Sequence, residues 1–82
     1  MTDLHIRYFA AASEAAGASE QTVPVREGEQ LATVLQRVAK DNAELQRVLK
    51  LCSFLSDGKR VDRQSTVDPT YPLDVLPPFA GG

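Results

Sequence analysis

Apolar and polar positions alternate in two stretches near the start of the chain. Leu4, Ile6 and Tyr8 are separated by residues whose side chains would point the opposite way. A period of two residues is typical of a strand with one buried face. The alternation resumes over residues 20–25, where Pro24 has no N–H to donate to a neighbouring strand. We therefore expect this second strand to lie at the edge of a sheet.

Three other stretches have the pattern of helices. Residues 10–16 are rich in alanine and are followed by Gly17, a common residue just past the end of a helix. The clearest pattern is one apolar stripe at i, i+3, i+4 and i+7, formed by Leu31, Val34, Leu35 and Val38. A second, shorter stripe is formed by Leu45, Val48 and Leu49. Each stripe predicts a helix that packs with one side against a sheet.

The second half of the chain adds three short strands. Residues 52–55 are apolar, and Asp57-Gly58 is a strong signal for a hairpin turn. Val61 lies in the returning strand, and residues 73–76 form the last strand. We expect the first two strands to be antiparallel, and the first and last strands to run parallel in the middle of the sheet. This order predicts an α+β fold, the ubiquitin-like β-grasp, with helices packed on one face of a mixed sheet.

The length and composition narrow the class of protein. Eighty-two residues make one domain, so we interpret 1–82 as a single β-grasp unit with a flexible Gly-Gly tail at about 77–82. The formal net charge is −2 and the basic residues are scattered, which gives no footprint for nucleic acid. No apolar run approaches the roughly 20 residues that span a bilayer, and no signal peptide is recognisable. We expect neither nucleic acid nor a membrane as a partner.

The residues with reactive side chains do not form a catalytic pattern. The single cysteine, Cys52, is expected to be a small buried residue, and the single histidine, His5, a solvated surface residue. One cysteine and one histidine cannot form an internal disulfide or a structural zinc site, so we expect no metal and no bound cofactor. This cysteine usage fits a reducing compartment, and we expect a cytoplasmic protein.

The face of the sheet that the helices leave open is a candidate partner-binding face. Alternation places three apolar residues on it, Phe9, Leu55 and Leu76, on strands that should be adjacent. The same face would carry the polar residues His5, Arg7, Arg60 and Asp74. Three apolar residues close together are unusual on a purely solvated face, which favours an interface with another protein.

The last seven residues, LPPFAGG, are the other candidate for function. Pro77 and Pro78 favour a stiff, extended exit from the last strand, and Phe79 offers an apolar anchor beyond it. From Phe79 to Gly82 the chain could span roughly 13 Å, enough to enter a slot in another protein. Glycine has no Cβ and can pass a narrow constriction. The alternative is that two terminal glycines are simply an unstructured end.

The chain resembles the MoaD/ThiS family of ubiquitin-like sulfur carriers, and within it the small subunits of molybdopterin synthase. The resemblance lies in RYFAAASEAAG near the start, the Asp-Gly hairpin after CSFL, and LDVLPPFAGG at the end. It covers essentially the whole chain. Two positions depart from the simplest pattern: Arg60 stands where an apolar contact would be expected, and Leu76 replaces an aromatic residue common in relatives.

The resemblance implies a role for the C-terminus. The carboxylate of Gly82 would be adenylated by an adenylyltransferase that uses ATP and Mg²⁺, and then converted by a sulfurtransferase to a thiocarboxylate. The large catalytic subunit of molybdopterin synthase would receive this sulfur for a cyclic pterin precursor, in a heterotetramer of large and small subunits. The chain itself would be a non-catalytic subunit of that enzyme.

The resemblance also assigns residues to the partner. Phe9, Arg60 and Leu76 would meet the large subunit, next to Leu55 on the same face. The tail inserted into the partner would consist of Pro77, Pro78, Phe79, Ala80 and Gly81. Two alternatives stay open: a sulfur carrier for thiamine, cysteine or tRNA thiolation, and a ubiquitin-like modifier of other proteins.

Overall fold

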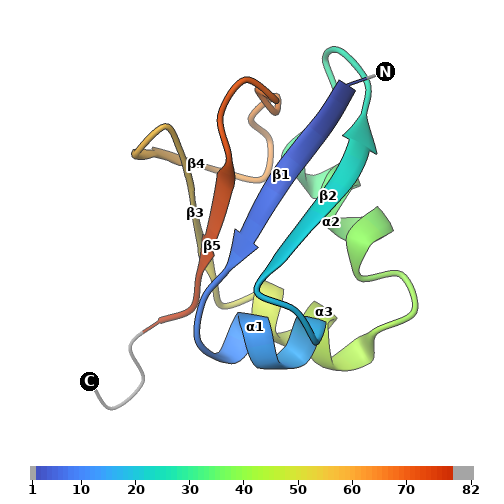
Figure 1. Ribbon diagram of the computed structural model, residues 1–82, viewed down its shortest axis with the longest axis vertical. Helices are drawn as coiled ribbons and strands as arrows, with labels where there is room; N and C mark the ends of the chain where they lie inside the picture. The colour runs from blue at the N-terminus through green and yellow to red at the C-terminus, as the bar shows by residue number, and fades with distance from the viewer. Residues whose placement is uncertain (1, 79–82) are drawn as a thin grey trace.

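The structure is a computed structural model and describes residues 2–78 (Figure 1). Its five strands are β1 (Thr2–Tyr8), β2 (Glu20–Val25), β3 (Ser53–Ser56), β4 (Lys59–Val61) and β5 (Leu73–Leu76). Its helices are α1 (Ala11–Ala16), α2 (Leu31–Val38) and α3 (Ala43–Leu49). The strands and helices follow the order expected from the periodicity, with boundaries that differ by one or two residues.

All five strands form one mixed sheet in the order β2-β1-β5-β3-β4. β1 and β2 are antiparallel, and β1 and β5 are parallel, as the sequence predicts. β3 is antiparallel to both β4 and β5. β2 lies at an edge, where the carbonyl of Pro24 accepts a hydrogen bond of 2.9 Å from the Arg37 side chain instead of from another strand. The predicted ubiquitin-like β-grasp is confirmed.

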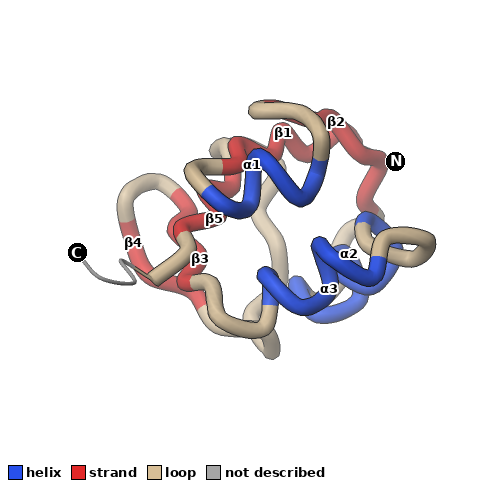
Figure 2. The backbone as a smooth tube through the Cα atoms, turned by 90° about the horizontal axis from the view of Figure 1, so that it is seen from below, coloured by secondary structure: helices blue, strands red, loops and turns tan. Residues whose placement is uncertain are grey.

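The core lies between the helices and one face of the sheet. Leu4, Ile6 and Tyr8 of β1 are 1%, 0% and 3% exposed, which confirms the alternation. The apolar stripes of α2 and α3 contribute the buried residues Leu31, Val34, Leu35, Leu45 and Leu49. Figure 2 shows the helices gathered on one side of the strands. The opposite face of the sheet has no helix on it among the described residues.

Two turns use the left-handed backbone region that the sequence indicates. Gly17 ends α1 with φ 77°, and its N–H donates to the carbonyl of Ser13 at 3.0 Å. Asp57 and Gly58 join β3 to β4 with φ values of 55° and 72°. Positive φ at both central residues matches the right-handed twist of the two strands, which keeps β4 in register beside β3.

We expect Ile6→Ala to lower the free energy of unfolding by about 2–5 kcal/mol, because Ile6 is fully buried and the change leaves a cavity. That is a large fraction of the roughly 5–15 kcal/mol that stabilises a typical domain. Chemical denaturation measures it. Thr22→Ala is the control, since Thr22 is exposed on the neighbouring strand and should change stability by less than about 0.5 kcal/mol. Equal costs in the two variants would contradict the assigned core.

Candidate functional site

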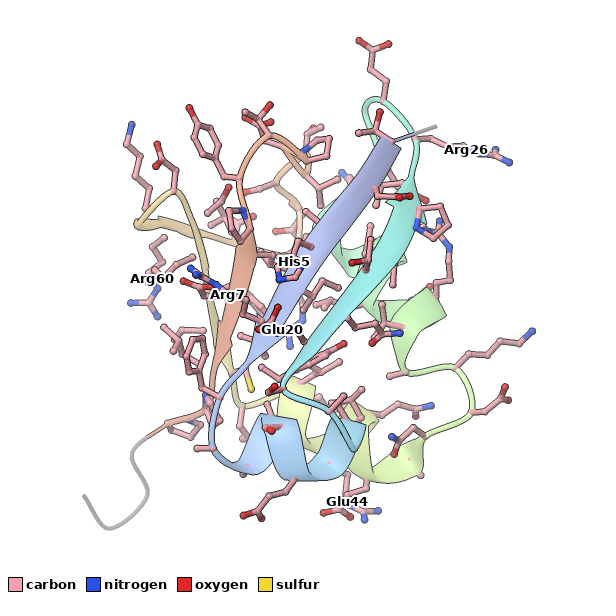
Figure 3. All side chains as sticks on the ribbon, in the orientation of Figure 1. His5, Arg7, Glu20, Arg26, Glu44 and Arg60 are labelled. Carbon is pink, nitrogen blue, oxygen red and sulfur yellow. The ribbon has the colours of Figure 1, made fainter. Side chains whose placement is uncertain are left out.

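The open face of the sheet brings four outward-pointing residues into one row. Arg7 of β1 lies opposite Asp74 of β5, Asp74 lies opposite Leu55 of β3, and Leu55 lies opposite Arg60 of β4. Partners in register share a face of the sheet, so the row crosses four strands. Leu55 and Arg60, which the sequence assigns to a partner-binding face, are therefore neighbours. Figure 3 shows Arg7 and Arg60 projecting on this side.

Phe9 and Leu76 lie beside that row on the same face, two residues further along the chain from Arg7 and Asp74, where β5 ends. The N–H of Phe9 donates to the carbonyl of Val75 at 3.2 Å, so Phe9 continues the pairing of β1 with β5. Leu76 is half-buried and lies opposite Ser53 of β3. Phe9 is 42% exposed, an unusual amount for a large apolar side chain. We call Phe9, Leu55, Arg60 and Leu76 the docking face, and their role in binding stays a prediction.

The chain leaves the sheet beside this docking face. β5 is the middle strand, with β1 on one side and β3 on the other, and Pro77 and Pro78 follow directly after its last residue. Pro77 is half-buried and Pro78 is exposed, so the chain reaches solvent within two residues of the sheet. Phe79, Ala80, Gly81 and Gly82 lie outside the described residues. Their assignment as an inserted tail is a prediction from the sequence.

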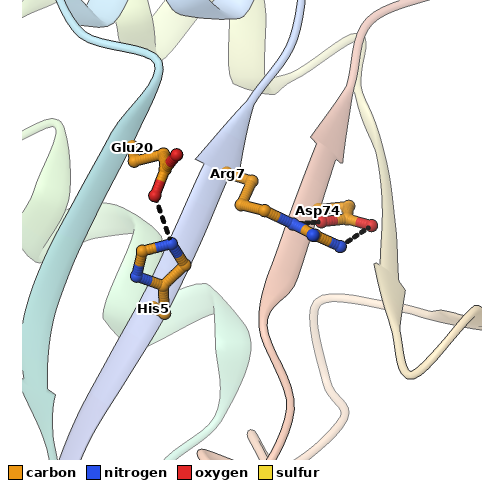
Figure 4. A network of polar contacts seen from close by, with 4 residues as sticks. All are labelled: His5, Arg7, Glu20 and Asp74. Carbon is orange, nitrogen blue, oxygen red and sulfur yellow. Dashed lines mark hydrogen bonds and ion pairs between the residues drawn. The ribbon is translucent and has the colours of Figure 1, made fainter.

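Arg7 and Asp74 form a bidentate ion pair in the middle of the open face (Figure 4). Arg7 Nε donates to Asp74 Oδ1 at 2.5 Å, and a terminal nitrogen donates to Oδ2 at 2.9 Å. The hydrogen bond and charge of Asp74 raise the pKa of the Arg7 guanidinium above its usual value. The pair neutralises the one carboxylate of the row.

Arg60 has a different environment from Arg7. Its guanidinium donates a hydrogen bond of 3.3 Å to the hydroxyl of Ser53, and no carboxylate within residues 2–78 forms an ion pair with it. Because Leu55 lies between Arg60 and Asp74, the docking face combines an apolar centre with a cation at its rim. A partner with an acidic residue at this position would match it.

His5 lies on the same side of the sheet, nearer the β2 edge. Its Nε2 is 2.7 Å from a carboxylate oxygen of Glu20, diagonally across to β2 (Figure 4). The two side chains are 42% and 59% exposed. The sequence predicts a surface histidine and misses its partner, because the contact depends on the register of two strands. Water competes for such exposed groups, so we assign the pair no catalytic role.

Cys52 is buried, as expected, and precedes β3. Its thiol donates to the carbonyl of Val48 at 3.2 Å, and burial raises the pKa of the thiol, although the charge of Arg63 acts in the opposite direction. A raised pKa leaves little thiolate at neutral pH, and thiolate is the nucleophilic form. Cys52 therefore fills the core and is unsuited to carrying sulfur itself.

This assignment predicts slow alkylation of Cys52 in the folded protein. We expect iodoacetamide at neutral pH to react with the folded chain at a rate about tenfold or more below its rate with the denatured chain. The reason is that the thiol of the folded chain is both buried and protonated. Mass spectrometry follows the single thiol without ambiguity, since the chain has one cysteine. The folded rate should continue to rise with pH beyond the usual pKa of a thiol, where the rate of an unperturbed thiol levels off, because the raised pKa delays formation of the thiolate. Equal rates in both states would show a reactive cysteine.

Residues 2–78 contain neither a candidate metal site nor a candidate membrane span. No group of three or more His, Cys, Asp and Glu residues lies close enough there to hold a metal ion. No described helix is both long and apolar enough to cross a membrane. The docking face and the adjoining exit of the chain are thus the feature with the clearest functional geometry.

Comparison with known proteins gives matches over nearly the whole chain. A family model described as the ThiS family matches residues 6–82. The molybdopterin synthase sulfur carrier subunit of Chlamydomonas reinhardtii is 28% identical in an alignment of length 82 that covers 96% of this chain and 98% of that protein.

Two solved structures show the same fold. The small archaeal modifier protein 1 of Haloferax volcanii has a TM-score of 0.80 and 19% identity, over 95% of this chain and 99% of that one. A chain in the complex of subunits 1 and 2 of molybdopterin-converting factor from Helicobacter pylori has a TM-score of 0.67 and 17% identity, over 99% of this chain and 100% of that one. These TM-scores establish the shared fold, whereas sequence identities this low carry no conclusion about function.

Proposed function

Because this chain belongs to the ThiS family, we propose that it is the sulfur-carrier subunit of a molybdopterin synthase and bears sulfur as a thiocarboxylate on Gly82. The family match extends to Gly82, and the Chlamydomonas reinhardtii sulfur carrier subunit aligns over almost the full length. The observation that carries the proposal is the position of β5. Its end leads through Pro77 and Pro78 directly away from the sheet, beside Phe9 and Leu76.

The chemistry requires activation because a carboxylate is a poor electrophile. An oxygen of the Gly82 carboxylate attacks the α-phosphorus of ATP, pyrophosphate leaves, and an acyl adenylate forms on the activating enzyme. A sulfide-level donor then attacks the acyl carbon, the C–O bond to the phosphate breaks, and AMP leaves. The product keeps one oxygen and gains one sulfur. The activating enzyme supplies the Mg²⁺ that ATP requires.

The chain's own contribution is to present this group and to be recognised. A central strand followed by two prolines gives the C-terminal segment a fixed point of origin, which limits the volume that Gly82 can explore. The docking face beside that origin would bind the large catalytic subunit. The Helicobacter pylori complex of two subunits supports a partner of this kind. Binding of the pterin precursor and any acid–base help would come from that large subunit.

A second function is favoured by one specific observation, the likeness to a small archaeal modifier protein. In that alternative the adenylated Gly82 would be attacked by a lysine amine of another protein instead of by a sulfur donor. Both functions use the same tail and the same activation step. They differ in the product, a thiocarboxylate in one case and an isopeptide bond in the other.

Reconstitution separates these functions. The sulfur-loaded chain is mixed with a molybdopterin synthase large subunit and the cyclic pterin precursor, and the dithiolene product is measured against unloaded chain. We expect product only with loaded chain. Loaded chain that transfers no sulfur to the pterin, but supports synthesis of a thiazole, of cysteine or of thiolated tRNA, would assign it to another pathway. Recovery of the chain as lysine conjugates from cells would favour the modifier.

A further inference from the structure

A groove of about 500 Å³ lies between α2 and α3. No residue of the docking face lines this groove. Its apolar floor includes Leu35, Ala39 and Leu49, which are core residues. Figure 2 shows both α2 and α3 on the helical side of the molecule, and residues of both line the groove. The row of Arg7, Asp74, Leu55 and Arg60 lies on the other face of the sheet, so the groove and the docking face open in different directions.

The rim of the groove is positively charged. It is formed by three basic residues, Lys40, Lys50 and Arg63, and no acidic residue within residues 2–78 lines the groove. The guanidinium of Arg63 is held in place, because it donates to the carbonyl of Leu49 and lies 5.1 Å from the centroid of the Phe54 ring. Two of the three lysines of the chain are here, in a protein whose formal net charge is −2. The groove is therefore a local concentration of positive charge.

The other cations of the two helices differ from those of the groove. Arg37 of α2 pairs with Glu29, and Arg47 of α3 pairs with Glu44. Lys40 and Lys50 are exposed and form no ion pair within residues 2–78. A lysine just past a helix end also complements the helix dipole, which would account for each lysine separately. It does not account for two lysines and an arginine from a third segment meeting around one apolar floor.

We propose that this groove binds an acidic, partly apolar segment of a partner protein. Carboxylates of that segment would meet Lys40, Lys50 and Arg63, while one or two aliphatic side chains would cover the floor. The lining includes Ala39 and Lys40, just past the end of α2, and Leu49 and Lys50, at the end of α3, so the carbonyl ends of both helices, which carry partial negative charge, lie at the groove. That field disfavours a concentrated anion such as phosphate. A peptide suits it better, because its carboxylates are spaced apart and can each approach a separate cation at the rim.

Two properties follow from the composition of the groove. The floor residues are already almost fully buried, so little apolar area remains to be covered and the affinity should depend mainly on charge. Salt should therefore weaken binding strongly. Because the groove and the docking face lie on different sides, the acidic segment and the proposed large subunit could bind at the same time. The groove does not depend on the proposed sulfur-carrier function.

The test is an NMR titration of the ¹⁵N-labelled full chain with a short synthetic peptide of alternating Glu and Leu. Saturable shifts should appear at amides of α2, α3 and Arg63 and be absent from Arg7 and Leu55. The double variant Lys40→Glu/Lys50→Glu should have an affinity for the peptide about tenfold or more below that of the unaltered chain. Two attractive pairs of exposed charges are lost in this variant and become repulsive. Lys59→Glu makes the same kind of charge change in β4, outside the groove, and should bind like the unaltered chain.

Several outcomes would overturn the proposal. These are no saturable shifts, shifts centred on the docking face, or equal affinity in the double variant and the Lys59→Glu control. A peptide with Gln in place of every Glu should not bind, and its binding with equal affinity would remove the role of charge. If inorganic phosphate or AMP shifts the groove amides and the peptide does not, the site belongs to a small anion and not to a protein segment. Circular dichroism establishes that each variant is folded.

Discussion

Deleting Gly82 is expected to abolish sulfur loading and sulfur transfer completely while leaving the fold unchanged. The reacting atom of the proposed mechanism is the terminal carboxylate carbon of Gly82, so the shortened chain would place its carboxylate one residue short of the position the activating enzyme requires. Loss of this one residue removes no part of the core, which consists of residues between Leu4 and Val75. Product formation in the reconstituted system and thermal unfolding are measured side by side.

A second variant is the matched control for this prediction. Appending one alanine after Gly82 keeps every native residue but moves the carboxylate outward by one position, and it should be equally inactive. Both variants should unfold at the temperature of the unaltered chain. Full activity of either one would exclude a tail mechanism that depends on the position of the terminal carboxylate. A fall in stability in both would instead assign the tail a structural role.

Phe9→Ala is expected to weaken binding to the large subunit by about 30-fold, which corresponds to the loss of about 2 kcal/mol at an interface hot spot. Phe9 is 42% exposed, continues the pairing of β1 with β5, and borders the point where the chain leaves the sheet. An aromatic side chain in that place gains apolar contact when the partner covers it. Isothermal titration calorimetry with the large subunit measures the effect.

Tyr71 provides a control of nearly equal size and exposure. It is 39% exposed and precedes β5, at the end of that strand opposite to the exit of the chain. Tyr71→Ala should leave the affinity within about twofold of the unaltered chain, as is usual outside a hot spot. Neither variant should change the free energy of unfolding by more than about 0.5–1 kcal/mol, because both residues are exposed and neither belongs to the buried core. Equal losses of affinity in both variants would contradict the docking face.

Periodicity predicts the fold well because each strand and helix has a sharp local pattern. Leu4, Ile6 and Tyr8 alternate without interruption, and the stripe from Leu31 to Val38 leaves no ambiguity about a helix. Pro24 also predicts the edge position of β2, since it cannot donate to a ladder. The pairing of β1 with β5 follows from the connections and from the apolar character of both strands. These features are local, or depend on simple rules of topology.

The contacts that the sequence does not predict are those between distant segments. The ion pair of Arg7 with Asp74 joins residues 67 positions apart, and it requires the exact register of two parallel strands. The pair of His5 with Glu20 depends in the same way on the register of β1 and β2. The residues of the docking face could be assigned to one side from alternation, but not arranged in order across it.

The basic groove illustrates the same limit at a larger scale. Lys40 and Lys50 each follow a helix, where a lysine is ordinary, and Arg63 lies in a loop after β4. Nothing in the spacing of these residues relates them to one another. They meet because α2, α3 and the loop after β4 come together around one groove. Only the folded chain brings their charges together.

The most direct measurement of the central claim is the intact mass of the chain after incubation with an activating enzyme, ATP and a sulfur donor. We predict a gain equal to the exchange of one oxygen for one sulfur, located by fragmentation on Gly82 and dependent on ATP. The gain should vanish when the activating enzyme is omitted. A chain whose mass stays unchanged with an activating enzyme that loads a known sulfur carrier under the same conditions would contradict the account.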